Sequence, residues 1–305
     1  MEHSFGGRWT DDKLERIDKY LSAYMTIFER NPAASRLETL YVDAFAGTGR
    51  RSEAKATGDP SEQLFEDAIE SEDAGELKKG SAHIALNRQR PFDRYLFVDR
   101  DQEHARQLED LRSTFPQLSD RIEIKVADAN PFLKRFCEST DWSRRRAVVF
   151  LDPYGMQVDW TTIEAIAATK AIDLWLLFPL GMGVNRLLTR RRPPGGAQAE
   201  RLTRMFGTDE WKEAFYRPDG QEEAQLFTLE EQSDDPSRAK SANFNAISEF
   251  FVSRLKLIFP GVSENPYPLT NSKNVPLYLL CFAAANPRGA PTAVNIANYI
   301  LKPQR

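Results

Sequence analysis

Cysteine and histidine are scarce in this chain of 305 residues. Its two cysteines, Cys137 and Cys281, lie far apart and outside any CxxC pattern, and its three histidines show no paired spacing. Disulfide frameworks, iron–sulfur clusters and zinc sites all depend on Cys or His at short, regular spacings. We therefore expect no metal site and two buried, unpaired thiols.

Long apolar runs are missing as well. The longest uncharged apolar stretch, residues 276–287, is too short for a membrane-spanning helix, which needs roughly 20 apolar residues. Residues 1–9 include neither the basic start nor the apolar segment of a secretory signal. These absences predict a cytoplasmic chain without membrane contact.

An excess of positive charge is also absent. The net charge of −4 argues against a protein that coats nucleic acid without sequence preference, because such binding needs many Lys and Arg residues on phosphates. One segment differs, because residues 186–204 contain six arginines and a single glutamate. A local basic patch is therefore expected in a protein of ordinary globular composition.

Hydrophobic periodicity predicts strands that alternate with helices. Apolar residues at three- and four-residue spacings predict a leading helix over residues 9–29. Alternating strands and helices are typical of a parallel sheet covered by helices on both faces. Residues 264–284 predict a hairpin whose proline-bearing first arm lies at an edge. The predicted strands before it cover residues 40–46, 95–98, 122–126, 147–151 and 172–178, and the predicted helices cover residues 81–86, 102–115, 131–137, 161–168 and 242–259.

This pattern suggests a core with three additions. We expect an N-terminal helical segment over residues 1–36 and a Rossmann-like core over residues 37–180 and 241–305. Residues 50–79 form an acidic insertion, with seven acids between positions 62 and 76. Residues 181–240 form a helical, basic insertion after the fifth strand.

Four predicted strands each carry an aspartate at or near the carboxyl end, and ligands of parallel sheets bind beyond the carboxyl ends of the strands. Asp43 opens a turn with Phe45, Gly47 and Gly49, in which the backbone can approach a ligand closely. The alternative for this phrase is a purely structural glycine turn.

The next two acids each have a structural alternative too. Asp99, followed by Arg100, stands where nucleotide-binding folds place an acceptor for ribose hydroxyls. Asp128, followed by Ala129, is suited to accept a hydrogen bond from an adenine amine. Either acid can instead cap the helix that follows it.

The fourth acid belongs to the most specific phrase, Asp152-Pro153-Tyr154-Gly155, at the end of an apolar strand. The Asp152 carboxylate and a proline-stiffened carbonyl are two acceptors for an amino group, and Tyr154 is a ring on which a flat substrate can stack. An amine held in this way keeps its lone pair available for an incoming methyl group. The alternative is a tight turn with a packing tyrosine.

These four phrases, in this order, resemble the motifs of S-adenosylmethionine-dependent methyltransferases. The phrase at 152–155 is similar to the Asp-Pro-Pro-Tyr box of amino-methyltransferases, with Tyr154 in place of the second proline, and to the Asp-Pro-Phe-Gly of tRNA guanosine N2-dimethylating enzymes. Most of the chain resembles the three-Cys-motif partner protein family, TcmP. The matching segments are Lys13-Leu14, Tyr20-Leu21 with Tyr24, residues 43–49, 80–86, 97–101 and 151–155, and the stretch 178–188.

The resemblance implies an α/β, Rossmann-like class I methyltransferase fold, with a seven-stranded, mostly parallel sheet in the order 3-2-1-4-5-7-6. It implies that S-adenosylmethionine binds at Asp43, Phe45, Gly47, Gly49, Asp99, Arg100, Asp128 and Ala129, with Asp152, Pro153 and Tyr154 on the methyl-acceptor side. It also implies a partner protein with a three-cysteine motif that resembles radical S-adenosylmethionine proteins.

The expected activity is N-methylation of a nucleobase in RNA or DNA, with Arg186, Arg190, Arg191 and Arg192 as phosphate contacts. A second cluster that would contact phosphates, before the fourth strand, is Arg144, Arg145 and Arg146. The alternative for these arginines is a solvated surface.

A non-catalytic adaptor of the three-cysteine-motif protein is the alternative function. A nicotinamide dehydrogenase fits less well, because Ser52 replaces the third fingerprint glycine. A phosphate-binding NTPase loop is excluded, since the chain has no Gly-Lys-Ser or Gly-Lys-Thr.

Overall fold

The fold is seen in a computed structural model that describes residues 8–46, 80–189, 192–216 and 242–303. Eight strands in these residues form one sheet, in the order β3-β2-β1-β4-β5-β8-β6, with β7 also paired to β8. The strands are β1 (Glu38–Asp43), β2 (Arg94–Asp99), β3 (Ile122–Val126), β4 (Arg145–Leu151), β5 (Ile172–Phe178), β6 (Gly261–Val262), β7 (Tyr267–Thr270) and β8 (Pro276–Ala284).

Strands β1 to β5 are parallel, and β8 runs antiparallel to β5. This mostly parallel order with one antiparallel strand confirms the predicted methyltransferase-like fold class. The predicted hairpin is also confirmed as β7 and β8, and the exposed Pro268 lies in the outer arm, where a missing N–H breaks no ladder. The two-residue strand β6 beside β8 was not predicted.

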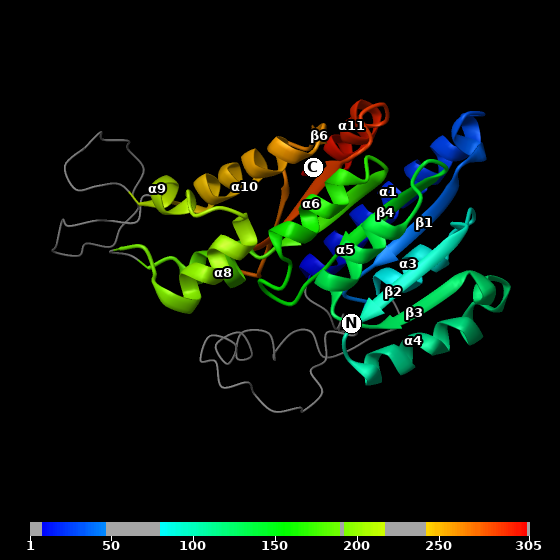
Figure 1. Ribbon diagram of the computed structural model, residues 1–305, viewed down its shortest axis with the longest axis horizontal. Coiled ribbons are helices and arrows are strands. Elements are labelled where there is room, and N and C mark those ends of the chain that lie inside the picture. Colours follow the sequence, from blue (N-terminus) through cyan, green and yellow to red (C-terminus); the bar gives the residue numbers. More distant parts are fainter. Residues whose placement is uncertain (1–7, 47–79, 190–191, 217–241, 304–305) are drawn as a thin grey trace.

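Helices cover both faces of this sheet (Figure 1). None of those in the described ranges is both long and apolar enough to cross a membrane. They are α1 (Arg8–Arg30), α3 (Ser81–Leu86), α4 (Gln102–Thr114), α5 (Ala129–Ser139), α6 (Trp160–Ala168), α7 (Asn185–Leu187), α8 (Gly196–Phe206), α9 (Trp211–Phe215), α10 (Phe244–Ile258) and α11 (Ala290–Ile300), with short helical turns η1 (Ala34–Arg36), η3 (Pro116–Arg121) and the π-helical η4 (Leu180–Val184).

The two-residue period of the strands divides the core into two layers. Leu40 and Val42 of β1 pack in one cluster with residues of α5, α6 and α10, whereas Tyr41 packs in the other cluster with α1, α3 and α11. In Figure 1, α5 and α6 lie in front of the sheet and α1 runs behind it. Helix α1 is thereby placed across the back of the central strands.

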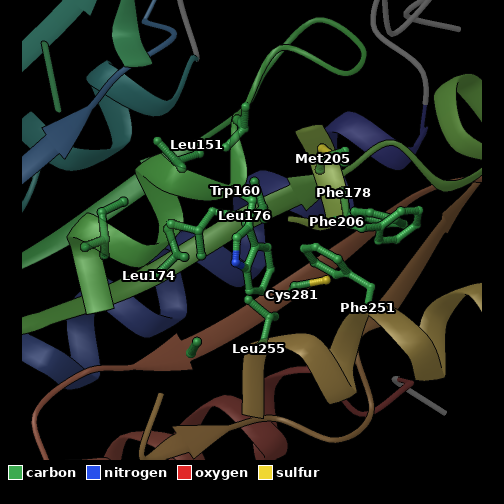
Figure 2. Close-up of a cluster of buried hydrophobic side chains, with 14 of the residues drawn as sticks. Leu151, Trp160, Leu174, Leu176, Phe178, Met205, Phe206, Phe251, Leu255 and Cys281 are labelled. Atoms are coloured by element: carbon green, nitrogen blue, oxygen red, sulfur yellow. The ribbon is translucent and has the colours of Figure 1, made fainter. Parts of the chain in front are cut away.

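The first layer extends beyond β5 into the predicted basic insertion. Figure 2 shows Phe178 at the end of β5 close to Phe206 of α8 and Phe251 of α10. The Phe178 and Phe251 rings stack with centroids 4.0 Å apart. Met205, Phe206, Trp211 and Phe215 are all buried in this cluster. Helices α8 and α9 are therefore part of the core rather than an appendage.

Sequence periodicity missed one helix, α11. Its buried face consists largely of alanines, with Ala290, Ala293 and Ala297 followed by Ile300. Small residues at helical spacing give little hydrophobic contrast, so the period was not recognised. A usable signal was present in Pro291, because proline is favoured in the first turn of a helix.

Candidate active site

The strand-end aspartates meet at one edge of the sheet, as the parallel order requires. In the β-ladder, Asp43 lies opposite Phe97 of β2 and Phe150 of β4, two residues before Asp99 and Asp152 respectively. Asp99 in turn pairs with Val126, two residues before Asp128. The edge therefore carries four carboxyl groups on four adjacent strand ends.

Asp43 is the most buried of these acids, with no exposed surface. Its Oδ2 accepts a hydrogen bond from Ser81 Oγ at 2.5 Å, and its Oδ1 has no partner among the described residues. Burial raises the pKa of Asp43 to about 7; Ser81 counteracts this shift, and the negative charge of Asp152 adds to it. A buried carboxylate oxygen without a partner is a feature that a bound cationic or hydroxyl-bearing ligand would satisfy.

Ser81 is the first residue of α3, but its side chain does not cap that helix. Gly80 occupies the N-cap position, without a side-chain cap. The Ser81 hydroxyl instead reaches Asp43 on β1. Local pattern could not reveal this bond, because 38 residues separate the two side chains.

Asp99 lies at the end of β2 with its side chain 15% exposed. Its Oδ1 accepts the backbone N–H of Asp101 at 2.7 Å and lies 3.3 Å from His104 Nδ1. Asp101, not Asp99, caps α4, by accepting from Glu103 N and His104 N. Asp99 is therefore not the cap of that helix and remains available at the edge, beside the exposed Arg100.

Asp128 is the N-cap of α5, and its side chain accepts from Asn130 N at 2.9 Å. Asp128 therefore caps the helix that follows it, as the structural alternative predicted. It is also exposed at the edge of the sheet. Ala129 begins α5 and is buried. Asn130 was not singled out from sequence, yet it bonds Gln157 O, Asp159 N and Thr162 Oγ1, so it anchors the loop that follows β4.

Asp152 directly follows β4 and forms an ion pair with Lys13 of α1, with Nζ 2.5 Å from Oδ2. The Lys13 side chain is 7% exposed and the Asp152 side chain 24%. The resemblance included Lys13, but its contact with the acceptor side was not predicted. A pairing across 139 residues depends on how α1 packs behind the sheet, which no local pattern encodes.

The rest of the Asp-Pro-Tyr-Gly turn is divided between the interior and the surface. Pro153 and Gly155 are buried, whereas Tyr154 is 38% exposed. Gly155 has a φ of 70°, in the left-handed region that glycine tolerates best. The turn therefore presents the Tyr154 ring at the edge of the sheet, on the same short segment as the Asp152 carboxylate.

The remaining predicted residues are Phe45, two exposed arginines and four residues that lie outside the described ranges. Phe45 is partly buried against the core. Arg186 on α7 and Arg192 are exposed. Gly47, Gly49, Arg190 and Arg191 lie outside the described residues, as do the acidic insertion and the polar stretch after residue 216. Within the described ranges, no group of three or more His, Cys, Asp or Glu side chains is placed to hold a metal ion.

A second basic feature lies at the opposite edge of the sheet. A cavity of about 290 Å³ there is lined by Arg36, Glu38, Asp141, Arg144 and Arg145. Arg145 is paired with Glu38, with Nε 2.5 Å from Oε2. Arg36 and Arg144 precede β1 and β4, and Glu38 and Arg145 are the first residues of those strands, so this cluster lies at the opposite edge from the strand-end acids.

The comparisons with known proteins give matches among solved structures alone. No protein-family model and no curated protein matches it. A DUF519-family protein from Legionella pneumophila is similar in structure, with a TM-score of 0.45 and 13% identity over 98% of this chain and 92% of that one. A spermidine synthase in complex with the transition-state analogue AdoDATO has a TM-score of 0.39 and 8% identity, over 92% of this chain and 61% of the other. At these values neither likeness carries an argument about function.

Proposed function

We propose that this chain is an S-adenosylmethionine-dependent methyltransferase of the three-Cys-motif partner family, which methylates an exocyclic amine of a nucleobase in RNA or DNA. The observation that carries the proposal is the meeting of four strand-end carboxyl groups at one edge of a sheet with methyltransferase-like order. The Asp-Pro-Tyr-Gly turn lies at that same edge and supports the choice of an amine as the acceptor.

On the cofactor side, the residues present fit S-adenosylmethionine. The buried Asp43 Oδ1 lacks a partner among the described residues, and the ligand has an ammonium group that can provide one. Asp99, at the neighbouring strand end, is suited to accept ribose hydroxyls, and the exposed Asp128 an adenine amine. When bound, the cofactor supplies a methyl group that is electrophilic because it is attached to a sulfonium.

On the acceptor side, Asp152 and the Pro153 carbonyl hold the acceptor amine through its N–H groups. Hydrogen bonding from these groups keeps the nitrogen lone pair free for the methyl group that the bound cofactor would supply. The nitrogen then loses one proton, which Asp152 accepts at Oδ1. Tyr154 stacks on the acceptor ring, and most of the rate enhancement comes from holding the two reactants in this order.

Calorimetric titration with S-adenosylmethionine and S-adenosylhomocysteine tests the proposal. We expect Asp99→Ala to lose about ten- to hundred-fold in affinity, because a hydrogen bond to a charged group contributes about 1.5–3 kcal/mol. Asp110→Ala is the matched control, since Asp110 is an exposed acid on the helix after the same strand. Thermal melting of each variant checks that it is folded.

The outcomes separate the two functions considered. Cofactor binding that is lost in Asp99→Ala but kept in Asp110→Ala supports the methyltransferase and justifies assays with tritiated S-adenosylmethionine on total tRNA, ribosomal RNA and DNA. If the folded wild-type protein binds neither ligand, the methyltransferase proposal fails. The non-catalytic adaptor then becomes the better hypothesis, to be tested by co-purification with a three-cysteine-motif protein.

A further inference from the structure

Lys13 makes a contact on the acceptor side that the proposed methyl transfer does not yet use. Its ammonium lies 2.5 Å from Oδ2 of Asp152, and its side chain is only 7% exposed. Lysine is almost never this buried unless it is paired. Taking both charges out of water is costly, so such a pair is weak evidence for stability, and a role in the site is a better reason for it.

The ammonium is held in place by its own helix and by the sheet. The Trp9 ring, one helical turn earlier, has its centroid 5.1 Å from Nζ, within the range of a cation–π contact. Trp9 also stacks on Tyr278 of β8, with centroids 5.3 Å apart. Arg16, further along α1, donates to the backbone oxygen of Ile300. Helix α1 therefore contacts the rest of the protein both before and after Lys13 in the sequence, which holds Lys13 in place.

Lys13 also acts on the cofactor side of the site. The groups that act on Asp43 are Tyr41 of its own strand, Ser81 of α3, the Asp152 charge after β4, the backbone N–H of Phe45 and the Lys13 charge on α1. Burial is the main reason for the raised pKa of Asp43; the Asp152 charge raises it further and the Lys13 charge lowers it. One buried cation thus balances two carboxyl groups that would otherwise repel each other.

We propose that Lys13 is a positioning residue of the acceptor site, which binds Oδ2 of Asp152 and so reserves Oδ1 for the acceptor amine. This inference rests on the proposed methyl transfer and adds to it. An unpaired carboxylate can rotate and offer either oxygen, whereas the ion pair fixes which one is offered. The pair also places an N–H donor next to a carboxylate acceptor. Such a pair matches an aromatic amine beside a ring nitrogen or carbonyl, as in adenine, cytosine and guanine.

Carbon-detected NMR titration of the aspartate carboxyl groups tests this without any ligand. Lys13→Met keeps most of the side-chain volume and removes the charge. We expect it to raise the titration midpoint of Asp43 by about one pH unit, with Lys13→Arg close to wild type. Lys19→Met is the matched control, because Lys19 lies on the same helix and pairs with Glu15 at 2.5 Å, but both side chains are about half exposed.

Asp152→Asn removes the same ion pair from the other side and is expected to move the Asp43 midpoint in the opposite direction, downward. If Lys13→Met does not fold, the Asp43 midpoint in Asp152→Asn provides the test instead. An Asp43 midpoint that stays at its wild-type value in every folded variant of the pair would overturn the inference. So would an equal shift in Lys19→Met, because the effect would then not belong to the site.

A second readout separates positioning from cofactor binding. At about pH 9, where Asp43 is ionised with or without the Lys13 charge, Lys13→Met should bind S-adenosylhomocysteine within about threefold of wild type, yet transfer methyl groups to total tRNA or ribosomal RNA about tenfold more slowly or worse, with partial rescue by Lys13→Arg. Full turnover in Lys13→Met would contradict the positioning role. If the wild type binds no S-adenosylhomocysteine, the proposed function fails, whereas the carboxyl titration still decides whether Lys13 controls Asp152 and Asp43.

Discussion

At the scale of single residues, Asp43 shows how a predicted site residue can oppose stability. The side chain is fully buried, and burial raises its pKa to about 7, well above the value of about 3.9 expected in an unfolded chain. The folded state therefore binds a proton that the unfolded state releases between roughly pH 4 and pH 7. In that window, rising pH lowers the free energy of unfolding. Above about pH 7, the charged and desolvated carboxylate continues to destabilise the folded state.

Asp43→Asn is therefore predicted to stabilise the protein at high pH. The asparagine side chain keeps the size of the aspartate and an oxygen for Ser81, but it cannot ionise. We expect the free energy of unfolding of the variant to exceed that of wild type by about 1–4 kcal/mol at pH 8, with the difference shrinking below pH 5. Urea unfolding at several pH values measures it.

A second buried acid does not disturb this comparison. Burial also raises the pKa of Asp173, to about 6, and Tyr20 donates to its Oδ2 at 2.6 Å. Asp173 contributes equally to both proteins, so its effect cancels in the difference between them. Parallel stability curves for wild type and Asp43→Asn would contradict the prediction. The same substitution should weaken S-adenosylhomocysteine binding if the proposed function is correct.

At this scale, whether a contact could be predicted depends on how far apart its two residues lie in the sequence. Asp43, Asp99, Asp128 and Asp152 were predicted at one edge because each lies at or just after the end of its own strand, which is a local property. Lys13 meets Asp152 only when α1 packs behind the sheet, so no local pattern could place that contact. Whether the acids bind the cofactor stays a prediction, because pattern and position define an edge but not its ligand.

At the scale of elements, α8 joins the predicted basic insertion to the core through its C-terminal glycine. Gly207 ends α8 in the left-handed conformation, with φ of 70°, and its N–H bonds Thr203 O at 2.7 Å. A Cβ atom at this position would lie 2.0 Å from Cδ1 of Trp160, a buried residue at the start of α6. The close approach leaves room only for glycine.

Gly207→Ala is therefore expected to destabilise the protein by at least about 2 kcal/mol, from backbone strain together with overpacking against Trp160. Gly195→Ala at the other end of α8 is the control. Gly195 has a negative φ of −113°, and no atom lies within 4 Å of the position of an added Cβ. Denaturant unfolding of both variants measures the difference, and equal stabilities would show that α8 is not fixed against α6.

Some helices and strands were predicted closely from the sequence and others were missed, for physical reasons. Helix α1 and strand β4 have strong apolar periods or runs, and both were predicted within a few residues. Helix α11 buries a face rich in alanine, so its period was too weak to recognise. The packing of α8 against α6 depends on Gly207 and Trp160, which are 47 positions apart, and so was beyond a sequence-based prediction.

At the scale of the whole molecule, charge is distributed unevenly between the two edges of the sheet. Arg36, Arg144 and Arg288 are exposed at the edge opposite the strand-end acids, before β1, before β4 and after the antiparallel β8. Arg190, Arg191 and Arg192 follow β5, whose carboxyl end lies at the same edge as the acids, although the first two are outside the described residues. These two sets of arginines allow a test in which the two variants carry the same net charge.

Reversing all three of Arg190, Arg191 and Arg192 to glutamate should weaken binding of total tRNA about tenfold or more at about 50 mM salt. It should also flatten the dependence of log affinity on log salt by about 2, because each lost phosphate contact removes about 0.7 from the slope for single strands.

The control reverses Arg36, Arg144 and Arg288. Each triple variant takes the net charge from −4 to −10, since every reversal removes 2 charges. General repulsion therefore acts equally on both, and only contact with phosphates at the site edge distinguishes them. Equal weakening in the two variants, measured by filter binding between about 50 and 200 mM salt, would mean that the segment after β5 is a solvated surface and that the acceptor reaches the site by another route.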